Sequence, residues 1–276
     1  MKVRQVVAGV DGSLVSVRAL DRAADEAARR GASLRILYAV PDLDEAGPIL
    51  AAAAARVRAR HPGLPVTTRA VRGNAARALA RESEGAALTV VGTRGLGGLA
   101  GRLLGSVSLR LAAHVHSPLL VVRGDHPCGN GGEVLLGLAG DADSDVAAYA
   151  FQEAERRGAR LRVLHSWNHR HVTPEMPLPG TATTPGRTRL IQQDRAEEAV
   201  PRYAVTRLKE QHPAVGIDTR TVRTGPAHAL LEATRTADIV VIGARRRIHR
   251  AGPHLGQVAH TLLHRSHCPV LVVPTR

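Results

Sequence analysis

The stretch VTTRAVRGNAARALARESEGAALTVVGTR, residues 66–94, decides the fold. Its two ends are short runs of apolar and β-branched residues, and the segment between them has helical periodicity. The same pattern returns as IDTRTVRTGPAHALLEATRTADIVVIGAR, residues 217–245. A strand, a helix and a second strand in this order predict a βαβ unit with parallel strands.

The repeat extends over the whole chain. Further segments recur in the same order, about 150 residues apart: RQVVAGVDGS (4–13) with EVLLGLAGDA (133–142), ALDRAADEAARRG (19–31) with AYAFQEAERRG (148–158), ASLRILYAV (32–40) with ARLRVLHSW (159–167), and LRLAAHVHSPLLVVR (109–123) with VAHTLLHRSHCPVLVVP (258–274). The chain is therefore predicted to hold two copies of one domain, residues 1–125 and 132–276. The linker at 126–131 belongs to a polar stretch that contains Gly and Pro.

Within each copy, strand-like and helix-like segments alternate. This alternation predicts an α/β fold of two tandem flavodoxin-like, or Rossmann-like, domains. Each would be an open five-stranded parallel sheet in the order 3-2-1-4-5, with helices on both faces. In the first copy the expected strands are about 4–10, 33–40, 65–71, 87–92 and 119–123, and the expected helices about 13–30, 48–60, 74–85 and 105–115. The second copy adds 168–186, which is rich in Pro, Thr and Gly and is expected to be irregular.

Composition narrows the class of protein. The formal net charge is +14, and Arg carries nearly all of the positive charge. Aromatic residues make up only 2%, too few for the stacking platforms that nucleic-acid binding needs. No apolar run is long enough to span a bilayer, and the N-terminus does not resemble a signal peptide. We expect a cytoplasmic protein without membrane contact, with Cys128 and Cys268 as free thiols.

The residues that could carry chemistry follow the first and fourth predicted strands of the first copy. Asp11 ends the first, and GTRGLGGLAGRLLGS (92–106) begins at the end of the fourth. In a 3-2-1-4-5 sheet these two ends lie side by side, at the position where open α/β sheets bind ligands. Glycines let backbone N–H groups approach a phosphate, and a helix starting near Gly105 and Ser106 would direct its positive end there. Ser106 is also a good N-cap residue.

These residues make the chain similar to the universal stress protein family in its tandem-domain form. The resemblance rests on Asp11 in VVAGVDGS and on the motif Gly92-x-x-Gly95-nine residues-Gly105-Ser106, which in that family marks members that bind ATP. It implies that Gly92, Gly95, Gly105 and Ser106 hold ribose and phosphates, with Val107 and Ser108 at the helix start. It also implies that Asp11 meets the nucleotide directly or through magnesium, and that the Val40 backbone reads adenine.

The second copy departs from the motif. Counting from Gly243, the second glycine position is Arg246, and Gly256 is kept but is followed by Gln257. The strand-end acid is missing, because Leu138 or Ala139 occupies its position, and Trp167 stands in place of Val40. We therefore expect the nucleotide mainly in the first domain, with a degenerate second site.

Other site chemistries find less support. GLGGLA (95–100) matches the dinucleotide fingerprint but follows the fourth strand instead of the first, so no redox cofactor is expected. A Walker-type phosphate loop and a G-x-S-x-G elbow are absent from the sequence. His260 and His264 have the i, i+4 spacing of two metal ligands, but HTLLH lacks the glutamate of an HExxH site, and His165, His169 and His171 have no obvious completing ligand. No metal held by protein ligands alone is expected.

The function expected from this resemblance is nucleotide-dependent stress response or signalling, with ATP bound and not turned over by a dedicated catalytic site. Two alternatives remain open: a scaffold protein of the same fold without nucleotide, and a slow ATPase in which Asp11 activates water. The two domains are expected to form an intramolecular pseudo-dimer in which LLVV (119–122) meets VLVV (270–273). A homodimer and a further protein partner, unknown from sequence, are left open.

Overall fold

The computed structural model describes residues 4–93, 105–114, 116–123, 132–140, 143–167, 185–245, 247–249 and 252–275. The first domain alternates strands and helices: β1 Gln5–Val10, α1 Leu14–Arg29, β2 Ser33–Val40, a short 3₁₀ turn η1 Leu43–Glu45, α2 Ala46–Arg60, β3 Val66–Arg72, α3 Ala75–Glu82, β4 Leu88–Gly92, α4 Ser106–His114 and β5 Leu119–Val122.

The second domain repeats the order of strands and α-helices with one addition. Its elements are β6 Glu133–Leu138, α5 Ser144–Arg157, β7 Arg160–Ser166, α6 Pro185–Gln211, β8 Ile217–Val222, α7 Pro226–Ala233, β9 Ile239–Arg245, β10 Arg247–His249, β11 Gly252–His254, α8 Gln257–Arg265 and β12 Val270–Thr275. The addition is the small antiparallel pair β10–β11, which follows β9 where the first domain has its glycine-rich stretch. Of the segment expected to be irregular, residues 168–184 lie outside the described residues, and 185–186 begin α6.

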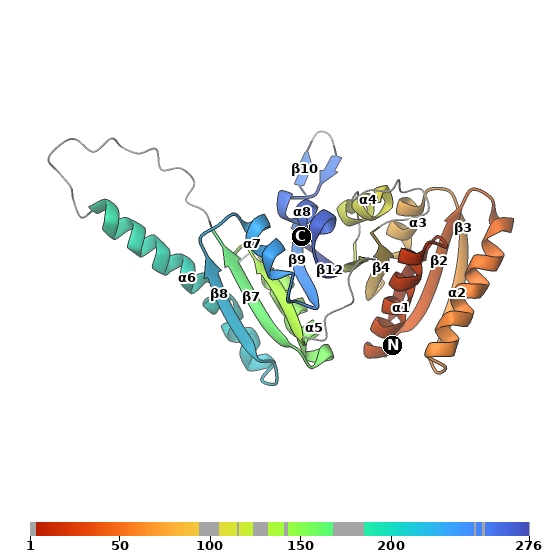
Figure 1. The fold of residues 1–276 in the computed structure, drawn as a ribbon, viewed down its shortest axis with the longest axis horizontal. Helices are drawn as coiled ribbons and strands as arrows, with labels where there is room; N and C mark the ends of the chain where they lie inside the picture. The colour runs from red at the N-terminus through yellow and green to blue at the C-terminus, as the bar shows by residue number, and fades with distance from the viewer. Residues whose placement is uncertain are drawn as a thin grey trace.

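The strands form one ten-stranded sheet in the order β3-β2-β1-β4-β5-β12-β9-β6-β7-β8. Each half has the predicted 3-2-1-4-5 order with parallel neighbours, so the predicted fold is confirmed. The halves join where β5 and β12 pair antiparallel, with Val121 opposite Val270 and Leu119 opposite Val272. This is the predicted meeting of the two last strands, and it makes the two domains an intramolecular pair (Figure 1).

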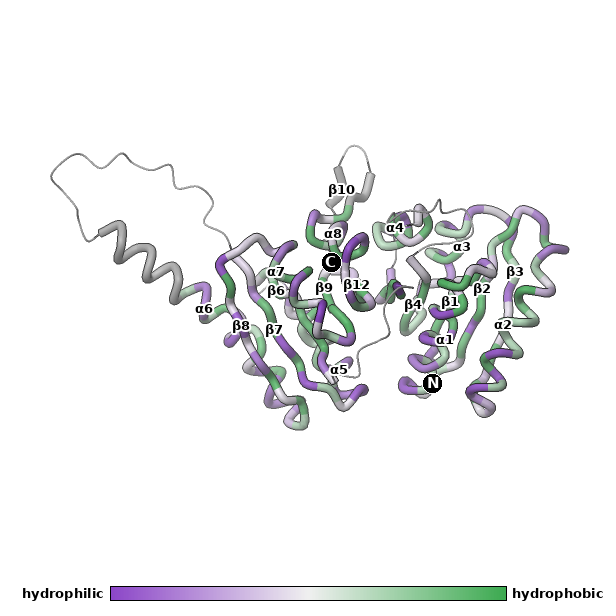
Figure 2. The backbone as a smooth tube through the Cα atoms, viewed as in Figure 1, coloured by the Kyte–Doolittle hydropathy of each residue, from purple (hydrophilic) through white to green (hydrophobic). Residues whose placement is uncertain are grey.

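Helices cover both faces of the sheet because both faces are apolar. In β1, Val6 contributes to the core beneath α1, α2, α5 and α6, and its neighbour Val7 to the core beneath α3, α4, α7 and α8. Both side chains are fully buried. Such continuous burial is typical of parallel strands covered on two sides. Hydrophobic residues accordingly concentrate along the strands (Figure 2).

A cluster of buried ions also joins the domains, at the C-terminal ends of α1 and α5. Glu26 and Glu153, fully buried, occupy equivalent positions in the two copies. Arg30 of the first domain donates to Glu153 at 2.6 Å, and Arg157 of the second donates to Glu26. Each arginine also binds the glutamate of its own helix. The ion pairs are therefore exchanged between the domains with approximate two-fold symmetry.

Candidate functional site

The predicted site residues of the first domain gather at the carboxyl edge of the sheet. β1 and β4 are parallel neighbours in which Ala8 lies opposite Val90. Asp11, which follows β1, is thereby brought to the same edge as Gly92, the last residue of β4. The start of α4 lies there too, because its Gly105 N–H donates to the carbonyl of Thr93 at 2.6 Å. Gly95 lies outside the described residues.

Asp11 is held by the turn that leads into α1. Its carboxylate oxygen Oδ1 accepts hydrogen bonds from the Ser13 N–H at 3.1 Å and the Ser13 hydroxyl at 2.6 Å. Ser13 in turn caps α1 by accepting from the Ser16 N–H at 3.2 Å. Gly12 between them has a positive φ of 82°, which a side chain would disfavour. The carboxylate is half-buried and fixed at the positive end of a helix, where a negative charge is favoured.

Gly92 has a packing role that depends on no ligand. A Cβ at this position would lie 2.8 Å from Cγ1 of Val15 and 3.2 Å from its backbone carbonyl carbon. The Gly92 carbonyl accepts a hydrogen bond from the hydroxyl of Ser108 at 2.6 Å. Ser108 is buried, so its hydroxyl ties the first turn of α4 to the end of β4. It therefore positions the helix.

The start of α4 presents the groups that can meet an anion. The Gly105 carbonyl accepts the first helical bond, from the Leu109 N–H, so Gly105 and not Ser106 occupies the N-cap position. Ser106 is the first helical residue, with its side chain exposed, and Val107 is half-buried beside it. The first N–H groups of any helix lack partners inside the helix, and they point out of its start.

Val40 ends β2 at the same edge and is buried. Its carbonyl accepts a hydrogen bond from the Gly73 N–H at 3.1 Å. A backbone carbonyl has two lone pairs, so this bond leaves acceptor capacity at the position to which the family resemblance assigns adenine.

The second domain has the same strand and helix arrangement at this edge, but different side chains occupy it. Gly256 caps α8 as Gly105 caps α4, accepting from the His260 N–H at 3.0 Å, and exposed Gln257 follows it. Gly243 again faces the adjacent helix, since a Cβ there would lie 3.0 Å from Cγ2 of Val146. Arg246 lies outside the described residues, between β9 and the β10–β11 pair.

The structure assigns Ala139, not Leu138, to the position of Asp11, because Val10 lies opposite Tyr38 as Leu138 lies opposite His165. An acid that sequence reasoning missed stands nearby. Asp143, buried at the start of α5, accepts the Ala139 N–H through Oδ2 at 2.7 Å. Its Oδ1 would lie 3.6 Å from a Cβ on Gly243. The acidic run DADSD (141–145) was the available signal, but it gave no indication of which carboxylate turns inward.

Trp167 takes the place of Val40 and is buried, with the Arg223 guanidinium 5.5 Å from the centre of its ring. The neighbouring His165 is also buried, and both of its ring nitrogens have partners. Nδ1 donates to the Leu138 carbonyl at 3.0 Å, and Nε2 meets Glu197 Oε2 at 2.9 Å. A large indole ring therefore fills the position where the first domain has a valine, and the paired His165 stands in place of Tyr38.

The described residues give no support to a metal centre. Within them, no group of three or more His, Cys, Asp or Glu side chains is placed to hold a metal ion. His260 and His264 stack with their ring centres 4.3 Å apart. Burial, then the neighbouring His260 and Arg123, lower the pKa of His264. Cys268 is a buried free thiol, whereas Cys128, His169 and His171 lie outside the described residues.

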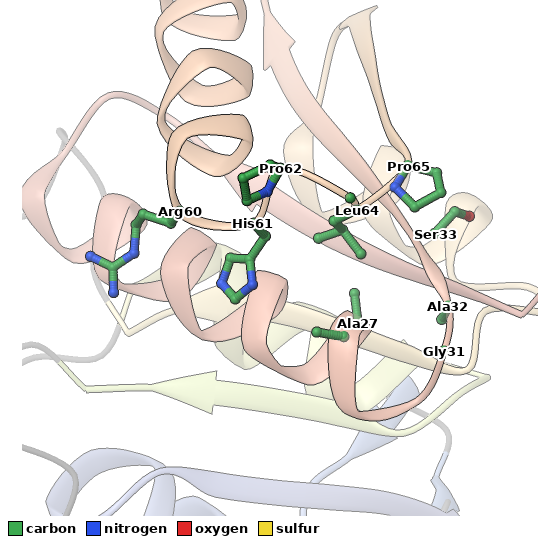
Figure 3. Close-up of a pocket in the computed structure, with 11 residues that line it drawn as sticks. Ala27, Gly31, Ala32, Ser33, Arg60, His61, Pro62, Leu64 and Pro65 are labelled. Atoms are coloured by element: carbon green, nitrogen blue, oxygen red, sulfur yellow. The ribbon is translucent and has the colours of Figure 1, made fainter.

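A large pocket lies away from this site (Figure 3). It has a volume of about 670 Å³ and is formed by the end of α1 and the segment that joins α2 to β3, including His61, Pro62 and Leu64. Its walls are mainly apolar, and it opens near the amino ends of β2 and β3, the opposite edge from Asp11. It is therefore separate from the predicted nucleotide site.

The family of the protein follows from the match to a family profile. The model of the universal stress protein family matches residues 2–123 and 132–274. The chain belongs to the universal stress protein family. A universal stress protein of Mycolicibacterium smegmatis is 31% identical over 296 residues, covering 98% of this chain and 97% of that protein.

One solved structure of similar length agrees with the fold. A functionally unknown protein from Pseudomonas aeruginosa PAO1 matches with a TM-score of 0.68 and 19% identity, covering 99% of this chain and 93% of that chain. A universal stress protein solved in complex with cAMP is 34% identical, with a TM-score of 0.38, over 44% of this chain and 98% of its own. No helix in the described part of the chain is long and apolar enough to cross a membrane.

Proposed function

We propose that this universal stress protein binds ATP at the carboxyl edge of its first domain and acts as a nucleotide-dependent stress-response or signalling protein. The observation that carries the proposal is the start of α4. The Gly105 N–H donates a hydrogen bond to the Thr93 carbonyl at 2.6 Å. This bond holds the positive end of the helix at the sheet edge where Asp11 and Val40 also lie. A helix start of this kind favours phosphate.

Asp11 would meet the ribose hydroxyls or hold a magnesium ion that neutralises phosphate charge. Its carboxylate already receives two hydrogen bonds from Ser13, which fix its orientation. The same bonds favour a positioning role over that of a general base, so we propose binding without dedicated catalysis. A bound nucleotide would contact both the β1 turn and α4, and would bias the surface that these elements offer to a partner.

The first domain is the proposed site because the second has Ala139 in place of the acid, Gln257 in place of Ser106 and the β10–β11 pair beyond Gly243. The cap glycines themselves are equivalent, which provides a matched test. Gly105→Arg places a long side chain at the start of α4, and Gly256→Arg does the same at α8, where the structure offers open space around Gly256.

Isothermal titration calorimetry with ATP tests the proposal on the full chain. We expect one binding event in the wild type, a loss of affinity of at least tenfold in Gly105→Arg, and unchanged affinity in Gly256→Arg. ADP, AMP and cAMP titrated in parallel identify the preferred nucleotide. Absence of any binding by the wild type would overturn the proposal in favour of a scaffold protein, and equal affinities in the wild type and Gly105→Arg would overturn the site.

A further inference from the structure

A second, polar pocket lies at the seam between the two domains, near the amino ends of β1 and β4. It has a volume of about 260 Å³. The first domain contributes residues just before β1, just after α1 and just before β4, and the second contributes one face of α5: Arg4, Arg30, Gly85, Ala87, Tyr149, Gln152 and Arg156. The pocket is therefore complete only when the two domains are paired.

Arg30 is fixed in this pocket by the buried ion cluster. Its side chain is only 4% exposed, and its guanidinium binds Glu26, Glu153 at 2.6 Å and the Tyr149 hydroxyl at 3.5 Å. Burial alone would lower the pKa of Arg30, but Glu153 and Glu26 outweigh that effect, so the pKa is raised and the group stays charged. One wall of the pocket is thus a rigid cation.

The described lining contains arginines and no acid, although two of these arginines are paired with buried glutamates next to the pocket. Among the described residues that line the pocket, three are arginines and none is acidic. The two glutamates of the cluster, Glu26 and Glu153, are shared among five arginines, of which Arg30 and Arg156 line the pocket: Arg22, Arg29, Arg30, Arg156 and Arg157. The seam therefore has a formal excess of positive charge next to a space that can admit a ligand.

The remaining polar groups of the lining can also donate hydrogen bonds. Arg156 lies 5.9 Å from the centre of the Tyr149 ring and donates to the Gln152 side-chain oxygen at 3.0 Å, which leaves the Gln152 amide hydrogens for other acceptors. Burial chiefly raises the pKa of Tyr149, so its hydroxyl keeps the proton. Exposed Arg4 adds a guanidinium at the rim. Such a set of donors suits a ligand with several anionic oxygens.

We propose that this interdomain pocket binds a small phosphoryl anion of the orthophosphate or pyrophosphate type. Guanidinium groups match phosphate oxygens in geometry and charge. The volume lies below the range of roughly 300–1,000 Å³ typical of pockets for drug-sized ligands, which favours a small anion over a whole nucleotide. A bound anion would bridge β1 of one domain and α5 of the other, and would stabilise their pairing. This site is independent of the nucleotide proposal, because it lies at the opposite edge of the sheet.

Calorimetry with sodium pyrophosphate tests the proposal on the full chain, in the wild type and in four variants: Arg4→Gln, Arg58→Gln, Gly105→Arg and Tyr149→Phe. Arg4→Gln removes one lining charge, and Arg4 has an exposed side chain, so the fold should persist. Arg58→Gln removes an exposed charge on α2 outside the pocket and serves as the matched control. Gly105→Arg blocks the α4 start, the other place where pyrophosphate could bind.

We expect binding in the wild type, unchanged binding in Arg58→Gln and Gly105→Arg, and about tenfold weaker binding in Arg4→Gln, the loss expected for one charge-assisted hydrogen bond. Tyr149→Phe should also weaken binding. Pyrophosphate should raise the melting temperature of the wild type more than that of Arg4→Gln. Equal affinities in Arg4→Gln and Arg58→Gln would overturn the pocket, and loss of binding in Gly105→Arg would assign the anion to the nucleotide site instead.

Discussion

The carboxyl edges of the two domains share one scaffold and hold different chemical groups. Gly92, the last residue of β4, and Gly243, near the end of β9, both face a helix valine, and Gly105 and Gly256 both cap the following helix. The first domain adds the Asp11 carboxylate and exposed Ser106 to this frame, whereas the second has Ala139 and Gln257. α4 and α8 lie on the same side of the molecule, at the top of the view (Figure 1).

This comparison separates glycines that the fold requires from residues that a ligand would require. The second domain has lost the acid and the hydroxyl of the motif but keeps Gly243, because a Cβ there would meet Val146 and Thr275. A retained glycine in this family motif is therefore weak support for a nucleotide site. The presence of Asp11 and Ser106 beside it is the better indicator.

At the buried ion cluster, in contrast, the two domains are nearly equivalent, with Glu26 in one and Glu153 in the other. Glu26→Gln and Glu153→Gln should each have the largest effect, a loss of about 3–5 kcal/mol in the free energy of unfolding. Each change removes one of the two carboxylates that Arg30 and Arg157 share, so buried positive charge is left in excess. Denaturant unfolding measures the loss, with Glu84→Gln, an exposed glutamate near α3, as a control expected to be close to neutral.

The pH dependence of Glu26→Gln supplies a further check on the cluster. Burial raises the pKa of Glu26, but Arg157, Arg30 and Arg22 outweigh it and lower the pKa from 4.5 to about 2. A lowered pKa gives stability that is fully present above pH 4.5 and is lost as the pH falls through about 2. The wild type should lose that stability in acid, and Glu26→Gln should lack this part of the acid transition. Identical acid transitions would contradict the role of Glu26.

Alanine at Gly92 and at Gly243 should have intermediate effects that differ between the domains. At Gly92 the new Cβ would meet backbone atoms of Val15 at 3.2 Å, which cannot rotate away. At Gly243 it would meet only side-chain atoms, at 3.0 Å and beyond. We expect Gly92→Ala to lose about 2–3 kcal/mol and Gly243→Ala about 1 kcal/mol. Thermal unfolding should show a larger loss of stability for Gly92→Ala than for Gly243→Ala. Gly63→Ala serves as the control with unchanged stability, because a Cβ at Gly63 would have no atom within 4 Å. A Gly92→Ala variant as stable as the wild type would contradict the packing role of Gly92.

A small effect, similar to that of Gly243→Ala, should come from the cap of α1. Ser13→Ala removes the acceptor of the Ser16 N–H and a donor to Asp11, and should lower stability by about 1 kcal/mol. Ser144, exposed at the start of α5, has no such cap bond in the structure, so Ser144→Ala should stay within about 0.5 kcal/mol. Chemical denaturation compares the two, and equal stabilities would show that Ser13 contributes no cap.

The sequence by itself determined the class of fold and the repeat. Alternating periodicities near residues 66–94 and 217–245 fix strands and helices locally, and their recurrence implies two domains with the same strand order. It also predicted the pairing of 119–122 with 270–273, through the family resemblance and the apolar character of these strands. Asp11, Gly105 and Ser106 could be chosen as candidate site residues because strand ends converge in the predicted topology.

Only the tertiary structure decided how these residues are used. In the structure Gly105 occupies the cap position expected for Ser106, and the Ser108 hydroxyl donates to the Gly92 carbonyl. Asp143 accepts the Ala139 N–H at the carboxyl edge of the second domain. The fold also assembles Arg4, Arg30 and Arg156 into one pocket. These facts depend on contacts between segments distant in sequence, which local periodicity does not encode. The arginines that carry nearly all of the positive charge of the chain thus include a few with defined, buried partners.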